Sequence, residues 1–147
     1  MAAKSMIRHW IEYVPDWRDE PMAYWVHIER APVAWKEATV FDPAAPIAIP
    51  HHGYPVLCVE TVGTEFRFSS PAQLVECVRV LSLTPLPTSS CLSSLRPGDN
   101  ARSLGPNRHW LSRLPAQVKS SKGRARVVDD LGEVLRARTP EHPFWST

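Results

Sequence analysis

The sequence predicts a single α+β domain over residues 1–147, with a small antiparallel sheet packed against helices on one face. Three observations support this class. Residues 56–68 have the pattern of a β-hairpin, a helix start follows them at Ser70, and residues 121–138 carry a helical apolar stripe. Hydrophobic residues make up 44% of the 147 residues and charged residues 22%, which is typical of a globular domain.

The N-terminal third contains the elements that the sequence defines least well. A helix is predicted from about Ser5 to Val14, before Pro15, because apolar residues recur at the spacing of one helical face: Ile7, Trp10, Ile11 and Val14. A strand is predicted over 22–29, with Tyr24, Val26 and Ile28 on one face. Residues 33–41 favour a second strand slightly, although residues 34–38 also suit the start of a helix.

The middle of the chain gives the clearest local signals. Residues 42–55 contain four prolines and are predicted to form a loop. Two β-type segments, 56–61 and 65–68, then flank a turn that contains Gly63. The helix that follows has Ser70 as its cap, Pro71 at its first position and Gln73 at the capping-box position. Its expected apolar face consists of Leu74, Cys77, Val78 and Leu81.

Residues 84–106 are rich in Pro, Ser and Gly, and they are long for a connection inside one domain. They are interpreted as a functional loop, a partly disordered stretch or an internal boundary. Asn107 is then predicted to cap a short helix that ends at Leu114. A last helix is predicted from Ser121 to about Arg138, with an apolar face of Val127, Val128, Leu131, Val134 and Leu135.

Charge is distributed unevenly along the chain. Residues up to Gln73 include six basic and nine acidic side chains, whereas the remainder includes eleven basic and six acidic ones. Between Arg96 and Arg126, eight basic residues are opposed by Asp99 alone. Such a segment predicts a surface that binds an anion, either a nucleic acid or an acidic or nucleoprotein partner. The expected contacts are Arg102, Arg108, Arg113, Lys119, Lys122, Arg124 and Arg126.

Two parts of this segment are the sharpest candidates. Residues 120–126 place three cations in the first turns of a helix, and Gly123 would allow an anion to approach closely. The alternative is a solvated first turn in which Arg126 pairs with Asp130 at i,i+4. Trp110 could stack on a base while neighbouring arginines hold phosphates, or it could belong to the core.

Aromatic side chains of the first quarter suggest a protein-binding surface. Trp17 lies between Asp16 and Arg18 and is expected to be exposed. Trp25 is a further candidate if one face of its strand is uncovered, and Trp110 is the third. The alternative is a Trp-rich core, since Trp is well buried on average.

Catalytic, metal and cofactor signals are weak, so a non-enzymatic protein without a cofactor is expected. His51 and His52 are adjacent in a loop, but a structural zinc site needs about four ligands and no others can be named. A Cys91–His109 pair lacks any signature of a catalytic cysteine. No signal peptide or membrane span is predicted, and the cytoplasm is the expected location.

The segment Gly105-Pro-Asn-Arg-His-Trp-Leu-Ser-Arg-Leu-Pro115 resembles a stretch in uncharacterised small proteobacterial proteins that are often encoded on mobile elements. The resemblance implies no fold and no catalytic residues. By analogy it favours proteins that bind nucleoprotein machinery, including anti-CRISPR and other defence inhibitors. Nucleic-acid association is therefore the first hypothesis, a protein-binding inhibitor or adaptor is the second, and a small enzyme using His51, His52 or His109 is the third.

Overall fold

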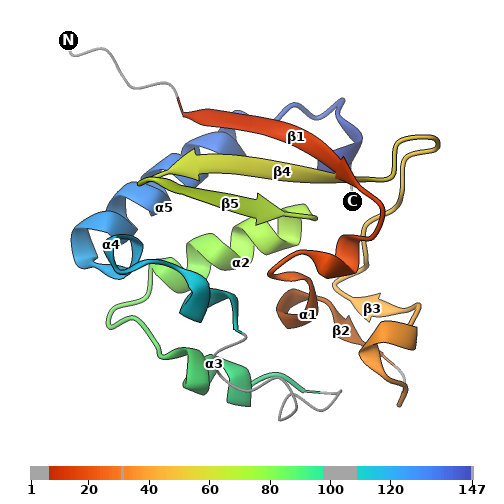
Figure 1. Cartoon of the computed structure of the whole chain (residues 1–147), viewed down its shortest axis with the longest axis horizontal. Coiled ribbons are helices and arrows are strands. Elements are labelled where there is room, and N and C mark those ends of the chain that lie inside the picture. The colour runs from red at the N-terminus through yellow and green to blue at the C-terminus, as the bar shows by residue number, and fades with distance from the viewer. Residues whose placement is uncertain (1–6, 31, 98–108, 147) are drawn as a thin grey trace.

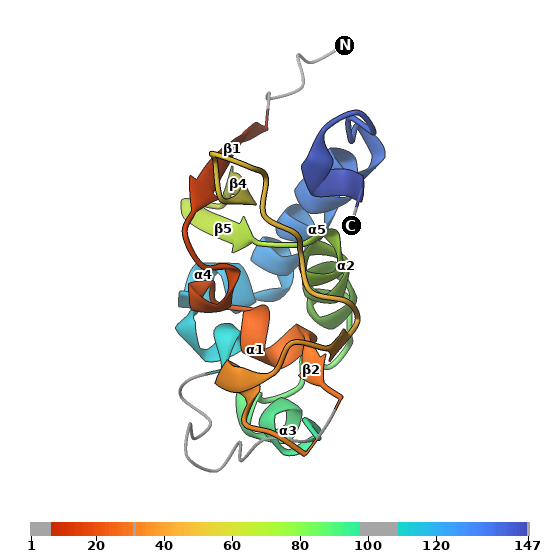
Figure 2. The same cartoon turned by 90° about the vertical axis from the view of Figure 1, so that its right-hand side faces the viewer.

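A three-stranded antiparallel sheet with two long helices on one face forms the centre of the molecule. The computed structural model describes residues 7–30, 32–97 and 109–146. The strand order is β1–β4–β5, with β1 at Arg8–Val14, β4 at Tyr54–Thr61 and β5 at Thr64–Phe68. Helices α2 (Pro71–Leu81) and α5 (Ser121–Arg136) pack together on the same side of this sheet (Figures 1 and 2). The predicted α+β class is confirmed.

Shorter elements complete the chain and pack around this centre. Strands β2 and β3 pair to form a second, two-stranded antiparallel sheet. The short elements are η1 (Trp17–Asp19), α1 (Ala23–Val26), β2 (Ile28–Glu29), η2 (Trp35–Glu37), β3 (Phe41–Asp42), α3 (Ser89–Ser94), η5 (Trp110–Arg113), α4 (Ala116–Lys119) and η6 (Pro143–Ser146). No helix in the described ranges is long and apolar enough to cross a membrane.

The hairpin and the helix after it form as the sequence predicts. Thr61 pairs with Thr64, so the turn consists of Val62 and Gly63, whose φ angles of 52° and 68° are both positive. Two positive φ angles are the mark of a type I′ turn, which matches the twist of the strands. The Ser70 hydroxyl accepts from the backbone N–H of Gln73, as a cap does. In a capping box the Gln73 side chain would accept from the N–H of the cap residue, Ser70. Here it accepts from the N–H of the preceding residue, Ser69.

The main core lies between the sheet and the helices α2 and α5. Buried side chains from the sheet, such as Leu57 and Phe68, meet buried side chains from α2 and α5, such as Leu74 and Leu131. Of the face predicted for the last helix, Val127, Leu131 and Val134 are buried, and Val128 and Leu135 are half-buried. On α2, Leu74, Cys77 and Leu81 are buried as expected, and Val80 joins them. Burial of this apolar surface is the main source of stability.

The helix predicted over residues 5–14 is wrong, because the described part of this segment is strand β1. It pairs with β4 from Arg8 opposite Glu60 to Val14 opposite Tyr54. Successive side chains of a strand alternate between faces, so Trp10 and Ile11 point to opposite sides of the sheet. Ile11 packs against the core, whereas Trp10 lies on the face away from the helices. Pairing with a distant strand has overridden the local helical spacing.

The strand predicted over residues 22–29 is also largely wrong. This segment begins with the helical turn α1, and β2 contributes strand only at Ile28 and Glu29. In the second segment, 33–41, only Trp35–Glu37 form a regular turn, the 3-10 helix η2, and strand β3 begins at the last residue of the segment, Phe41. These short elements enclose a second core cluster of buried residues: Trp17, Ala23, Trp35, Ala38 and Phe41. We attribute the short elements of residues 17–42 mainly to the packing of these aromatic rings, since the pairing of β2 and β3 involves only two residues of each strand.

In the described part of the long segment after α2, Ser89–Ser94 form helix α3, whose cap is Thr88. The predicted Asn107 cap lies outside the described residues. Instead of an α-helix, residues 110–113 form the 3-10 helix η5, and the ring of His109 caps it by accepting from the N–H of Leu111. The last helix begins at Ser121 as predicted, with Ser120 as its cap, and ends at Arg136.

Candidate nucleic-acid interface

Three successive elements carry the basic residues of the C-terminal segment. Arg113 ends η5, Lys119 ends α4, and Lys122 lies in the first turn of α5. Helices α4 and α5 pack against each other at one end of the molecule (Figure 1). Arg113 and Lys122 are exposed, and Lys119 is half-buried. We call Arg113, Lys119 and Lys122 the basic surface. Arg102 and Arg108, also expected here, lie outside the described residues.

Within the described ranges, no acidic side chain pairs with any residue of the basic surface. Arg126 differs, because its Nε lies 3.1 Å from an Asp130 carboxylate oxygen. This is the i,i+4 pair that the sequence offered as the alternative to anion binding. Asp130 also accepts from the hydroxyl of Thr61 at 2.6 Å, which fixes its carboxylate toward the β4–β5 turn. Arg126 is therefore already partly neutralised.

Arg124 does not lie with the other cations of α5. Residues four apart share a helix face, so Lys122 and Arg126 point to one side and Arg124 to another. Arg124 reaches the end of α2, where its Nη1 donates to the carbonyl oxygen of Leu83 at 2.8 Å. The prediction that three neighbouring cations converge on one anion is therefore not met by the contacts of Arg124 and Arg126.

Gly123 has a role in helix packing that the sequence did not indicate. A Cβ atom at this position would collide with the backbone carbonyl oxygen of Gln117 in α4. The N–H of Gly123 donates to the capping hydroxyl of Ser120 at 3.1 Å. The helix start thus uses this amide internally, and glycine lets α4 and α5 meet closely.

The three tryptophans proposed for protein binding differ in their exposure. Trp17 is only 2% exposed, so the prediction of an exposed side chain is wrong. Its ring packs edge-on against the rings of Trp35 and Phe41, with centroid distances of 5.7 and 5.3 Å. Trp110 is buried, as its alternative interpretation predicted. Trp25 is half-buried, and its ring centroid lies 4.7 Å from that of His109.

A hollow of about 210 Å³ opens beside Trp25 and His109. Its lining residues come from α1, β2, α2, α3 and the segment after it, and the start of η5, elements that the sequence did not bring together. Apolar and aromatic side chains form most of its wall, and four polar side chains contribute to it. Its lining is Trp25, Ile28, Glu76, Arg79, Leu92, Leu95, Arg96, Pro97, His109 and Trp110.

His109 is held in one tautomer inside this wall. Its Nδ1 accepts from the N–H of Leu111 at 3.1 Å, so the proton of the neutral ring lies on Nε2. The side chain is buried, and burial lowers the pKa of His109 to about 4. His27 is also buried, with ring nitrogens 3.0 Å from the Pro43 carbonyl oxygen and 2.8 Å from the Ser70 hydroxyl. Burial lowers the pKa of His27 as well.

Lowered histidine pKa values make the folded chain sensitive to acid. Between pH 6.5 and the folded pKa, the unfolded chain binds more protons, so stability falls as the pH decreases. For His109 the expected loss between pH 7 and pH 4.5 is about 2 kcal/mol. Urea unfolding at both pH values should show that His109→Asn, which can keep the cap but does not titrate, loses less stability than the wild type. Equal losses in the two proteins would contradict this assignment.

The other catalytic and metal candidates do not come together with His109. His51 and His52 are exposed in the turn before β4, and Cys91 is exposed on α3. Among the described residues, a group whose possible ligand atoms lie within 4.8 Å of one another is Glu12, Cys58 and Glu65. It includes none of the predicted residues.

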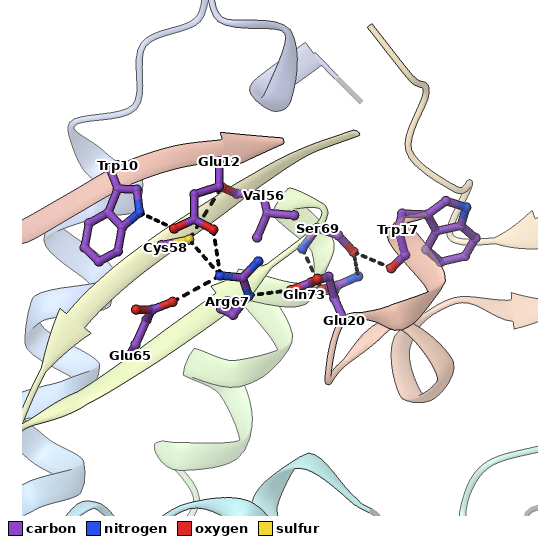
Figure 3. A network of polar contacts seen from close by, with 10 residues as sticks. All are labelled: Trp10, Glu12, Trp17, Glu20, Val56, Cys58, Glu65, Arg67, Ser69 and Gln73. Carbon is purple, nitrogen blue, oxygen red and sulfur yellow. Dashed lines mark hydrogen bonds and ion pairs between the residues drawn. The ribbon is translucent and has the colours of Figure 1, made fainter. Parts of the chain in front are cut away.

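Arg67 lies among these three side chains on the outer face of the sheet (Figure 3). Its guanidinium contacts Glu12 at 3.0 Å, Glu20 at 2.7 Å and Glu65 at 3.1 Å, and it donates to the Cys58 sulfur. These contacts raise the Arg67 pKa, chiefly through the hydrogen bond to Glu20. Burial raises the pKa of Cys58 to about 12, so its sulfur is a thiol and a poor metal ligand. Arg67 thus holds three glutamates of the same chain in ion pairs, and we call this group the Arg67 hub.

Comparisons with known proteins add no family to this description. No protein-family model, no curated protein and no solved structure matches this chain.

Proposed function

We propose that this chain is a non-enzymatic protein that binds nucleic acid through the basic surface of η5, α4 and α5. The observation that supports this function is the set of three cations, Arg113, Lys119 and Lys122, with no acidic partner among the described residues. Successive elements of the chain carry them, and two of these elements, α4 and α5, pack against each other. Lys and Arg side chains of this kind bind phosphates and release counterions from the nucleic acid.

Contacts elsewhere in the chain favour these three residues over the rest of the basic segment. Arg96 pairs with Glu29, Arg124 donates to Leu83 and Arg126 pairs with Asp130. Binding of phosphate by these three arginines would have to replace contacts that already exist. Arg113, Lys119 and Lys122 can bind phosphate without that loss.

Fluorescence anisotropy with labelled single-stranded DNA, duplex DNA and RNA tests this function. The wild type should bind at about 50 mM salt and lose affinity steeply by about 200 mM. The triple variant Arg113→Ala, Lys119→Ala, Lys122→Ala should bind at least about tenfold more weakly, with a shallower salt dependence.

A matched triple variant controls for the loss of charge. Lys36→Ala, Arg136→Ala, Arg138→Ala removes the same charge from exposed side chains outside the basic surface. It should bind much as the wild type does, because distant exposed charges are screened by salt. Equal weakening of both triple variants, or no binding of any probe at low salt, would contradict the proposed function.

A second candidate function, a protein-binding inhibitor or adaptor, is favoured by the Arg67 hub. Three glutamates surround one arginine on the face of the sheet opposite α2 and α5, which leaves an excess of negative charge (Figure 3). Such a face complements a basic partner. Binding of a Lys/Arg-rich peptide that weakens in Glu12→Gln and Glu65→Gln would support this function, and no binding at low salt would contradict it.

A further inference from the structure

The hollow beside His109 contains a hydrogen-bond donor without a partner. His109 uses Nδ1 to cap η5, and within the described residues no group bonds to Nε2. The side chain is only 4% exposed, yet it contributes to the wall of the hollow. Unlike Nε of Arg124, which is fully buried without a partner, Nε2 of His109 keeps some accessible surface. A bound molecule with an acceptor atom at this point can therefore accept from Nε2 in place of water.

The charged groups of the wall are already paired. Arg79 donates from Nε and Nη2 to the Glu76 carboxylate at 2.8 and 2.7 Å, which is a bidentate pair. Arg96 is bound to Glu29 at 2.8 Å, with the two side chains only 2% and 3% exposed. Among the described lining residues, the hollow therefore offers no unpaired arginine for a phosphate or carboxylate. Its free donor is a neutral imidazole N–H, which suits an uncharged acceptor.

Size and shape narrow the class of ligand further. At about 210 Å³ the hollow is smaller than the ~300 Å³ at which pockets for drug-sized molecules begin. It is large enough for one planar ring system. Trp25, Trp110 and the ring of His109 contribute aromatic surface to the wall, which suits stacking or edge contact with a flat heterocycle. The Glu76 carboxylate can accept from an amino or ring N–H group.

We propose that this hollow binds a single unstacked nucleobase, with the Nε2–H of His109 donating to a ring nitrogen or carbonyl oxygen of the base. The inference rests on the proposed function in one respect, since the base is taken to belong to a strand whose phosphates contact the basic surface. η5 connects the two regions: Trp110 at its start lines the hollow, and Arg113 at its end belongs to the basic surface. A base in a duplex must first be unpaired and unstacked to enter such a site, so single-stranded probes should bind more tightly than duplexes.

Free nucleosides test the hollow without the phosphate contacts. Adenosine, cytidine, guanosine and uridine are titrated against the wild type while tryptophan fluorescence is recorded, because Trp25 and Trp110 line the site. At least one nucleoside should quench the fluorescence with saturation, and ribose alone should not. Equal, unsaturated responses to nucleosides and to ribose would overturn the proposal.

Two variants locate the binding. His109→Asn can keep the cap of η5 but alters the donor, and it should weaken nucleoside binding about tenfold. Leu92→Trp fills the hollow from α3 and should abolish saturable binding, and it serves as the second variant if His109→Asn folds poorly. Val75→Ala, an exposed change on α2 outside the lining, should bind as the wild type does. Wild-type affinity in both hollow variants would overturn the assignment.

Oligonucleotide anisotropy separates the two proposals. Salt-sensitive binding of oligonucleotides without saturable nucleoside binding would overturn the base site and leave the basic surface as the interface. Saturable nucleoside binding without oligonucleotide binding would support the base site and contradict the proposed function. Binding of both, with Leu92→Trp weakening oligonucleotides while leaving their salt dependence unchanged, would support both.

Discussion

Arg96→Ala is expected to lower the free energy of unfolding by about 3–5 kcal/mol, because it removes one partner of a buried ion pair with the Glu29 carboxylate. The two side chains are 2% and 3% exposed and lie 2.8 Å apart. Arg96 also donates from Nε to the Tyr24 carbonyl oxygen, and its guanidinium carbon lies 3.7 Å from the centroid of the Tyr24 ring. One side chain thus joins the segment after α3 to α1 and β2. Urea or guanidinium unfolding at pH 7 measures the loss.

Arg79→Ala is the control for this prediction. It also removes an arginine from an ion pair with a glutamate, but the Arg79 side chain is 55% exposed, so about 0.5 kcal/mol or less should be lost. The double variant Arg96→Met, Glu29→Gln should recover part of the stability lost in Arg96→Ala, because it also removes the buried carboxylate charge that has lost the Arg96 guanidinium. Similar losses for Arg79→Ala and Arg96→Ala would show that the burial of the Arg96 pair is unimportant.

Gly123→Ala is expected to destabilise the fold by about 3 kcal/mol, because a methyl group cannot fit between α5 and the Gln117 carbonyl of α4. The obstruction is backbone, so α4 must move and the basic surface must move with Lys119. Gly132→Ala, on the same helix, is the matched control. There a Cβ lies 3.3 Å from the flexible Nη1 of Arg136, and the better helix propensity of alanine should stabilise by up to about 1 kcal/mol.

Thermal unfolding measures both changes in stability: the midpoint should fall in Gly123→Ala and rise in Gly132→Ala. A midpoint for Gly123→Ala equal to or above that of the wild type would contradict the packing role of Gly123. In that case the glycine would have to be explained by ligand access, as the sequence alone suggested.

Local signals allowed prediction of the middle and the end of the chain. The β4–β5 hairpin, the Ser70 cap and the apolar face of α5 each depend on residues close together in sequence, where turn and capping preferences act. Strand β1 depends on β4, which begins at Tyr54, so its pairing could not be inferred from residues 5–14. Its apolar spacing suits a helix, but only pairing decides which conformation forms.

Contacts between residues distant in sequence also limited the prediction of the candidate site. The charge count found the basic segment. It could not show that Arg96 is already paired with Glu29 or that Arg124 already donates to the Leu83 carbonyl oxygen. Trp17 has charged neighbours in sequence, and its burial comes from the rings of Trp35 and Phe41, which are distant in sequence. The sequence contains a weak indication of the Arg67 hub, because Glu65 and Arg67 are two residues apart in a predicted strand and therefore lie on the same face. Glu12 and Glu20 join it only through the pairing of β1 and the turn of η1.

The central position of β4 has a consequence for how the chain folds. Its pairing with β5 closes a turn of two residues, whereas its pairing with β1 must close a loop of residues 15–53. Closing that longer loop costs about 3 kcal/mol more chain entropy. We therefore expect the hairpin and α2 to form early in folding and β1 to join them late. Because Glu12 comes from β1, the Glu12–Arg67 ion pair would then form at this late step, and we expect it to slow unfolding more than it speeds folding.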